Sequence, residues 1–130
     1  TFPITTDLVG GTYVRRITAN FGTASKVVPV TLTPGFREFL LNGQTSATVK
    51  GGAPVAALVE LFGPAPTGGA TIAIIEDSSA LSAPTSVQVP ATSTKVNFTV
   101  TTAPVATNFA RYIQAKYGSR TLTRVITLTP

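Results

Sequence analysis

Two stretches decide the fold: TFPITTDLVGGTYVRRITANFGTASKVVPVTLTP, residues 1–34, and NFTVTTAPVATNFARYIQAKYGSRTLTRVITLTP, residues 97–130. They align without a gap at a constant offset of 96, since residue 1 lies over residue 97 and residue 34 over residue 130. Identical residues occupy 12 of the 34 positions, among them the turn glycine and the terminal Thr-Leu-Thr-Pro. Self-similarity at a fixed period is typical of tandem repeats. Residues 35–130 are therefore predicted to form one complete repeat, and residues 1–34 the last third of the repeat before it.

Apolar and polar side chains alternate along much of the chain with a period of two, which is typical of β-strands. Residues 55–62 show the pattern well, with two valines, an alanine and a leucine on one side. Further strands are predicted at 36–41, 46–50, 70–75, 85–90, 95–102, 107–117 and 120–128. The run ATIAII at 70–75 is expected to be buried on much of both faces.

Turn signals separate the predicted strands. They are Asn42-Gly43, Gly51-Gly52, residues 63–69, residues 82–84 and Gly118-Ser119. About seven short strands in residues 35–130, joined by such turns, predict an all-β fold, an antiparallel β-sandwich. Each copy of the repeated stretch holds a β-hairpin that turns at its glycine, so an N-terminal β-hairpin repeats the C-terminal one.

Four segments of the complete repeat carry a family resemblance. They are LFGPAPTGG at 61–69, APTSVQVP at 83–90, VNFTVTT at 96–102, and the Tyr117-Gly118 hairpin that ends in Thr-Leu-Thr-Pro. On these segments, residues 46–130 resemble bacterial immunoglobulin-like tandem repeats of large surface and secreted proteins. The resemblance implies an immunoglobulin-like sandwich that serves as a rigid spacer or display module of an extracellular or cell-surface protein.

The composition argues against catalysis. The chain has no His, Cys, Met or Trp, and its 10 Lys and Arg outnumber 5 Asp and Glu. Because His is the commonest general base and a leading metal ligand, we expect no enzyme, no catalytic residue, no cofactor and no metal. No apolar run approaches the ~20 residues of a membrane helix. A chain that begins at Thr1 without Met is expected to be a processed or excised piece with no signal peptide of its own.

Residues 1–34 cannot bury a core of their own, because two strands alone are marginally stable in water. Their apolar side chains are therefore predicted to form an assembly interface. It comprises Phe2, Ile4, Tyr13, Ile17, Ala19, Val30 and Leu32. Three arrangements are open: a longer array whose preceding strands lie outside this sequence, docking on another copy by β-augmentation, or one enlarged sandwich of about nine strands.

The leading functional hypothesis is a structural repeat module or subunit of an extracellular fibre, stalk or adhesin that assembles through β-strand pairing. The expected partners are neighbouring repeats or identical subunits, and identical subunits would give a homopolymer. The alternative is an immunoglobulin-like binding module for carbohydrate, such as a cell-surface polysaccharide, or another anionic ligand, bound through loops or a basic hairpin face.

The basic hairpin face comprises Arg15, Arg16, Arg111, Lys116, Arg120 and Arg124. A positive stripe attracts anionic ligands, whereas the plainer interpretation is a solvated sheet face that prevents aggregation. No nucleic-acid partner is expected, because no aromatic platform accompanies the charges.

Two minor sites complete the candidates. Residues 76–79 (EDSS), acidic where the resembling repeats are commonly rich in Ser or Asn, could contribute to a calcium site. Calcium takes six or more oxygens, however, and few other carboxylates are present. Lys50 or Lys95 could in principle form an isopeptide crosslink with an Asn beside a buried Glu60, although lysines at strand ends are usually solvated.

Overall fold

The computed structural model describes residues 1–7 and 9–130, and every regular element in that range is a β-strand. The strands are β1 Tyr13–Phe21, β2 Ala24–Leu32, β3 Phe36–Leu41, β4 Ser46–Lys50, β5 Val55–Leu61, β6 Ala70–Glu76, β7 Leu81–Ser82, β8 Ser86–Val89, β9 Lys95–Thr102, β10 Phe109–Tyr117 and β11 Arg120–Thr129. Over the described range no helix is present that is long and apolar enough to span a membrane.

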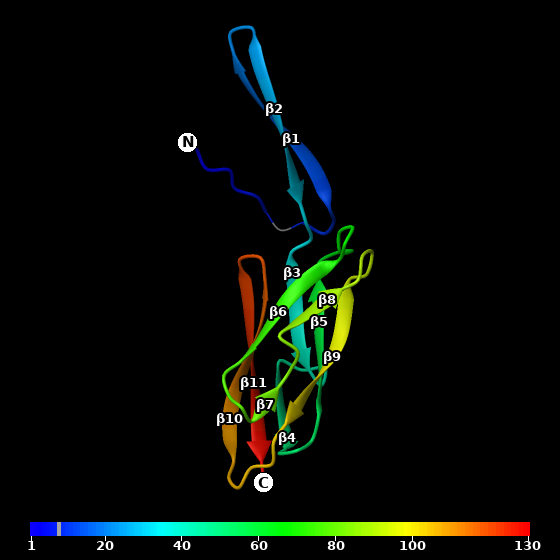
Figure 1. Cartoon of the computed structure of the whole chain (residues 1–130), viewed down its shortest axis with the longest axis vertical. Coiled ribbons are helices and arrows are strands. Elements are labelled where there is room, and N and C mark those ends of the chain that lie inside the picture. The colour runs from blue at the N-terminus through cyan, green and yellow to red at the C-terminus, as the bar shows by residue number, and fades with distance from the viewer. Residues whose placement is uncertain (8) are drawn as a thin grey trace.

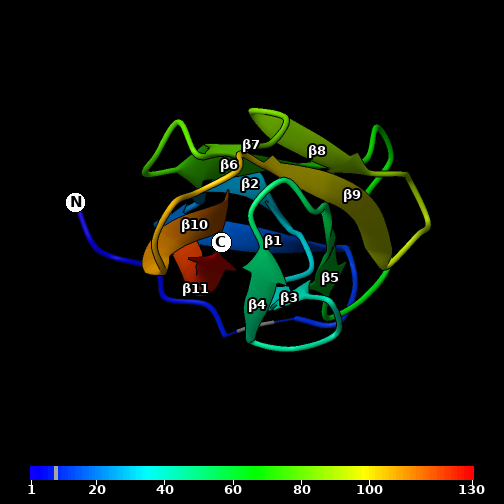
Figure 2. The ribbon, with the colours of Figure 1, turned by 90° about the horizontal axis from the view of Figure 1, so that it is seen from below.

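The molecule is elongated and has two parts (Figure 1). Strands β3 to β11 form a sandwich, and the β1–β2 hairpin extends beyond the end of the sandwich at which β3 begins. One sheet of the sandwich has the order β4-β11-β10-β6-β8 and the other β3-β5-β9-β7. Seen end-on, the strands of both sheets surround a common interior (Figure 2). The predicted fold class, an all-β immunoglobulin-like sandwich with an additional N-terminal hairpin, is confirmed.

Alternation along the strands explains the core. Val55, Val59, Val100, Ile126 and Leu128 are all 0% exposed, and each lies on the inward face of its strand. The prediction that residues 70–75 are buried on much of both faces is wrong, because the second face of β6 forms the outside of the sandwich. Ile75 on that face is 49% exposed.

Two further details differ from the sequence-based expectation. Residues 35–130 contain nine strands, including the two-residue β7, whose Ser82 begins the predicted turn at 82–84. The sandwich is also not wholly antiparallel, since β4 runs parallel to β11. The chain moves from one sheet to the other between β3 and β4, and β4 joins the second sheet as an edge strand beside β11.

The two hairpins have the same register. β1 pairs with β2 from Tyr13↔Leu32 to Phe21↔Ala24, and β10 pairs with β11 at the positions 96 residues later. Gly22 (φ 59°) and Gly118 (φ 60°) occupy the first central position of the two turns. The following residues do not have positive φ, so both turns are of type II′, which requires glycine at this position.

Candidate assembly interface

The N-terminal hairpin, strands β1 and β2, forms a two-stranded sheet of its own, so the structure does not contain the enlarged sandwich of about nine strands that the sequence left open. No residue of either strand is buried. Directly paired residues of antiparallel strands project to the same face. One face of the hairpin therefore carries a mainly apolar set, the apolar face, which is interrupted by Arg15 opposite Val30 and Lys26 opposite Ala19. Its members are Tyr13, Ile17, Ala19, Phe21, Val28, Val30 and Leu32.

Five residues of the predicted interface belong to this face. Tyr13 is 46% exposed, Ala19 is exposed, and Ile17, Val30 and Leu32 are half-buried. Sequence reasoning missed Phe21, which is 90% exposed, and Val28, which is 49% exposed. The alignment of Phe21 with Tyr117 was the signal that could have identified it.

Phe2 and Ile4, the other two predicted interface residues, lie in an extended segment that forms no strand. Phe2 is 71% exposed and Ile4 54%. Their counterparts at the 96-residue offset are Phe98 and Val100 of β9. Val100 is fully buried, and the Phe98 ring stacks on that of Phe39 with centroids 6.2 Å apart. The same apolar residues are thus covered in one copy and uncovered in the other.

The C-terminal hairpin, strands β10 and β11, shows how such a hairpin is covered. Its β10 edge pairs with β6 from Ile113↔Glu76 to Lys116↔Ala73. Its β11 edge pairs with β4 from Val125↔Ser46 to Thr129↔Lys50. Within the described residues, nothing pairs with the corresponding edges of β1 and β2. The N-terminal hairpin therefore presents both an apolar face and two open edges.

The base of the N-terminal hairpin is attached to the sandwich by backbone contacts. Gly35 N donates to Val9 O at 3.2 Å, and Phe62 N donates to Gly35 O at 2.9 Å. Gly63 packs so closely on Gly10 that a Cβ at Gly63 would lie 1.6 Å from the Gly10 carbonyl oxygen. Only glycine fits at this contact.

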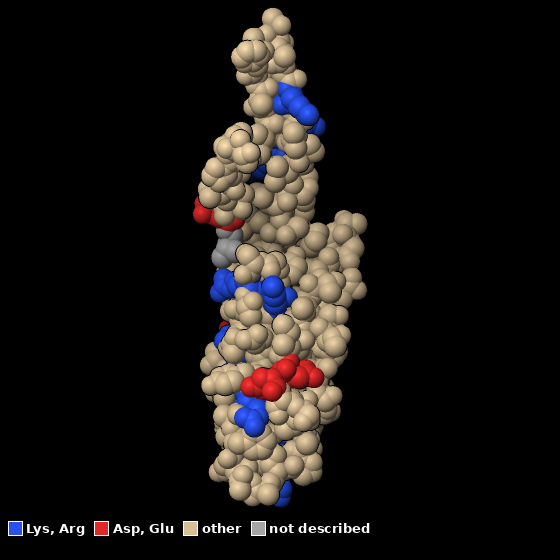
Figure 3. Space-filling view, turned by 60° about the vertical axis from the view of Figure 1, so that its left-hand side comes forward, with Lys and Arg blue, Asp and Glu red and all other residues tan. Residues whose placement is uncertain are grey.

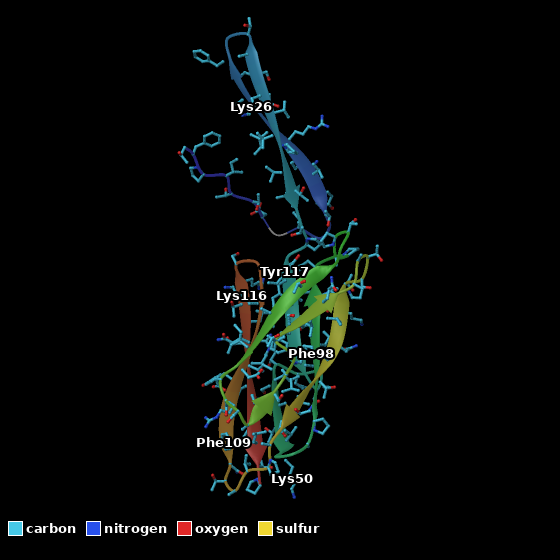
Figure 4. The ribbon with its side chains drawn as sticks, viewed as in Figure 1. Lys26, Lys50, Phe98, Phe109, Lys116 and Tyr117 are labelled. Carbon is cyan, nitrogen blue, oxygen red and sulfur yellow. The ribbon has the colours of Figure 1, made fainter. Side chains whose placement is uncertain are left out.

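The six predicted anion-binding residues do not share one surface. On the N-terminal hairpin, Arg15 lies 5.6 Å from the Tyr13 ring centroid, and Arg16 projects from the opposite face, because neighbouring residues of a strand alternate. On the face shown in Figure 3, Lys and Arg form several separate groups along the long axis. Figure 4 places Lys26 near the tip of the N-terminal hairpin and Lys116 near the middle of the long axis.

Two of the arginines on the C-terminal hairpin have structural contacts. The Arg111 guanidinium stacks over the Phe109 ring, 4.4 Å from its centroid. The Arg124 side chain donates from Nε to the Phe39 carbonyl oxygen and so links the two sheets. Arg120 is half-buried, and Lys116 is exposed on the outer face of β10. Binding of an anionic ligand by the six residues stays a prediction.

The minor candidates also have structural roles. Asp77 Oδ1 accepts from Tyr112 N at 3.1 Å, and the described residues contain no group of three potential metal ligands among His, Cys, Asp and Glu. Glu60 is half-buried rather than buried, and its Oε1 lies 3.4 Å from Arg37 Nη1. Lys50 and Lys95 are exposed.

No protein-family model matches this chain, and no curated protein matches it either. Three solved structures are similar in fold. The first is domains 4 and 5 of the S-layer protein SbsC, with a TM-score of 0.52 and 15% sequence identity over 92% of this chain and 59% of that one. The second is the D00-D0 domain of Intimin, with a TM-score of 0.54 and 17% identity over 93% of this chain and 67% of that one. The third is the D0-D1 domain of Intimin, with a TM-score of 0.55 and 13% identity over 92% of this chain and 63% of that one. The chain thus spans less than two thirds of two of these three structures. At such identities the likeness to these domains shows the fold alone.

Proposed function

We propose that this chain is a structural module of a tandem-repeat protein that is secreted or displayed on a bacterial cell surface. Residues 35–130 form one complete unit, and residues 1–34 are the last strands of the unit before it. The module acts by spacing and stiffness, through strand pairing between its segments, and performs no catalysis.

The identical register of the two hairpins carries this proposal. All nine residue pairs of the β1–β2 ladder recur 96 positions later in the β10–β11 ladder. Composition alone reproduces scattered matches, but it does not reproduce a shared register with the same turn glycine. The four residues of the C-terminal hairpin that are 0% exposed have close counterparts in the N-terminal hairpin. These four are Ile113, Ala115, Ile126 and Leu128.

The structural neighbours support the tandem arrangement. Two of the matched structures are named as pairs of Intimin domains and one as domains 4 and 5 of SbsC. The matches cover 92% or 93% of this chain, whereas residues 35–130 make up about three quarters of it. The superposition must therefore extend into residues 1–34. A surface location follows by analogy with the S-layer and Intimin proteins.

A fusion that places residues 35–96 directly before Thr1 tests the repeat assignment. This fusion supplies the N-terminal hairpin with the strands that cover the C-terminal one. Amide hydrogen exchange in β1 and β2 should slow to the rates seen in β10 and β11, because exchange rates report local opening. A matched fusion carrying Leu32→Asp should lose this protection.

Fast exchange in β1 and β2 of the unmodified fusion, equal to that in the present chain, would contradict the repeat assignment. Localisation has a separate test. Antibody raised against residues 35–130 should label intact source cells or their culture medium, and labelling only after lysis would exclude a surface role.

A further inference from the structure

The C-terminal hairpin occupies a defined site on the rest of the sandwich, the hairpin seat. The seat consists of the edges of β4 and β6 together with the inward face of β3 and β5. Ile113, Ala115, Ile126 and Leu128 fill it and are 0% exposed. A second hairpin that carried the same residues in the same register would fit the same seat.

The N-terminal hairpin meets this requirement at all four fully buried positions. Ile17, Ala19 and Leu32 are identical to their counterparts Ile113, Ala115 and Leu128. Val30 replaces Ile126 and is one methylene smaller, a change that cores usually tolerate.

Three other residues differ between the two hairpins at positions where the change has little effect on packing in the hairpin seat. Lys26 stands in place of Leu122, which is only half-buried, and a lysine stem can lie along apolar surface while its ammonium reaches water. Val28 in place of Arg124 loses the bond to the Phe39 carbonyl oxygen. Pro29 in place of Val125 lies opposite Ser46 at the first pair of the β4–β11 ladder, so its missing N–H removes at most one bond.

The N-terminal hairpin cannot reach the seat of its own chain in this register. Gly35 follows Pro34 directly, and consecutive Cα atoms are about 3.8 Å apart. In the seat, the residue equivalent to Pro34 is Pro130, which lies at the end of the sandwich opposite to the start of β3 (Figure 1). The ten residues of β11 separate the two ends by roughly 30 Å at about 3.3 Å per residue.

We propose that the N-terminal hairpin of one copy occupies the hairpin seat of a second copy whenever the C-terminal hairpin of that copy leaves it. The partner is thus an identical chain, and the contact is head-to-tail, which produces open chains of subunits. In the intact chain the C-terminal hairpin holds the seat, because an intramolecular competitor has a high effective concentration. The inference rests on the repeat assignment made above and names the partner for the same hairpin.

The test uses the full chain with the C-terminal hairpin disabled by Ala115→Glu, which places a carboxylate at a fully buried position. Sedimentation should show a folded monomer for the unmodified chain and concentration-dependent multimers with β-sheet circular dichroism for the variant. Ala19→Glu alone should leave a folded monomer. Ala19→Glu combined with Ala115→Glu should abolish both the multimers and the folded spectrum, because neither hairpin then fits the seat.

A cysteine pair checks the register, since the chain has no Cys of its own. Lys116 pairs with Ala73 across β10 and β6, and Asn20 is the residue equivalent to Lys116. In the Ala115→Glu chain, Asn20→Cys with Ala73→Cys should form disulfides between chains. In the unmodified background, Lys116→Cys with Ala73→Cys should close within one chain.

An Ala115→Glu chain that is unfolded and monomeric would overturn the proposal, and so would multimers that persist in the double glutamate variant. Either result leaves the fusion test untouched, because there the covering strands belong to the same polypeptide. If, in addition, the fusion gave β1 and β2 no protection from hydrogen exchange, the repeat assignment itself would be wrong.

Discussion

The N-terminal and C-terminal hairpins share a register and a turn type but not an environment. Ala115 is 0% exposed, whereas Ala19 at the same hairpin position is exposed. Tyr117 is half-buried, whereas Phe21 is 90% exposed. The comparison shows that strand pairing and the turn are encoded locally, while burial depends on the strands that surround the hairpin. Substitutions at equivalent positions should therefore have unequal effects.

The largest difference is expected for Leu128→Ala against Leu32→Ala. Leu128 is 0% exposed, so its truncation leaves a cavity and should lower the free energy of unfolding by about 2–5 kcal/mol. Leu32→Ala should change it by less than about 0.5 kcal/mol. Urea unfolding followed by circular dichroism measures both, and equal losses would mean that the N-terminal hairpin is covered in solution.

The next effect concerns the base of the N-terminal hairpin. Gly63→Ala places a Cβ 1.6 Å from Gly10 O, so the hairpin base must move away or the sandwich must distort. The free energy of unfolding should fall by about 1–3 kcal/mol, and amide shifts at residues 9–11 should change.

Gly10→Ala is the matched control, because its Cβ would meet only the Phe62 carbonyl oxygen at 3.5 Å. Solution NMR of both variants compares the two sides of one contact. Identical spectra at residues 35 and 62–63 in the two variants would show that the base is not packed as described.

A smaller effect is expected at the turns. Gly118→Ala forces an alanine to φ 60° and should lower the free energy of unfolding by about 1–2 kcal/mol. Gly22→Ala imposes the same strain at φ 59°, but on a hairpin that is not packed in the core, so global unfolding should not change. Thermal melts of both variants measure the difference, and a lower melting temperature for Gly22→Ala would contradict the independence of the two hairpins.

The smallest effect is expected for the alternative function, the binding of an anionic ligand. Arg15→Gln with Arg16→Gln should reduce retention on a heparin column, because both side chains belong to the exposed hairpin. Arg111→Gln should reduce it less, since that guanidinium stacks over the Phe109 ring. Retention that is unaffected by salt would contradict an electrostatic interaction, which salt screens.

Much of the fold was predictable because it is local. Alternation in residues 55–62 and 95–102 and the Asn42-Gly43 turn indicated strands, inward faces and turns that the structure contains. The parallel β4–β11 pair was not predictable, because it depends on a crossing between sheets. Neither was the bond from Arg124 to the Phe39 carbonyl, which joins residues 85 positions apart.

The candidate site was predictable in part for the same reason. Two strands with an apolar face and no core indicated that residues 1–34 need a partner. Only the strand register in the structure shows that the edges of such a hairpin pair with strands equivalent to β4 and β6. The close approach of Gly63 to Gly10 has no local sequence signal. Contacts between distant segments are the part that single-sequence patterns do not contain.

The parallel pairing of β4 with β11 has a mechanical consequence. Gly35 and Pro130 lie at opposite ends of the sandwich (Figure 1), so tension applied between them runs along the strands. A pull on Pro130 then shears the ladder from Val125↔Ser46 to Thr129↔Lys50 as a whole, because its bonds lie across the force and share it. Peeling would break the same bonds one after another at much lower force. Under the proposed tandem arrangement, tension along the long axis would load this ladder in shear.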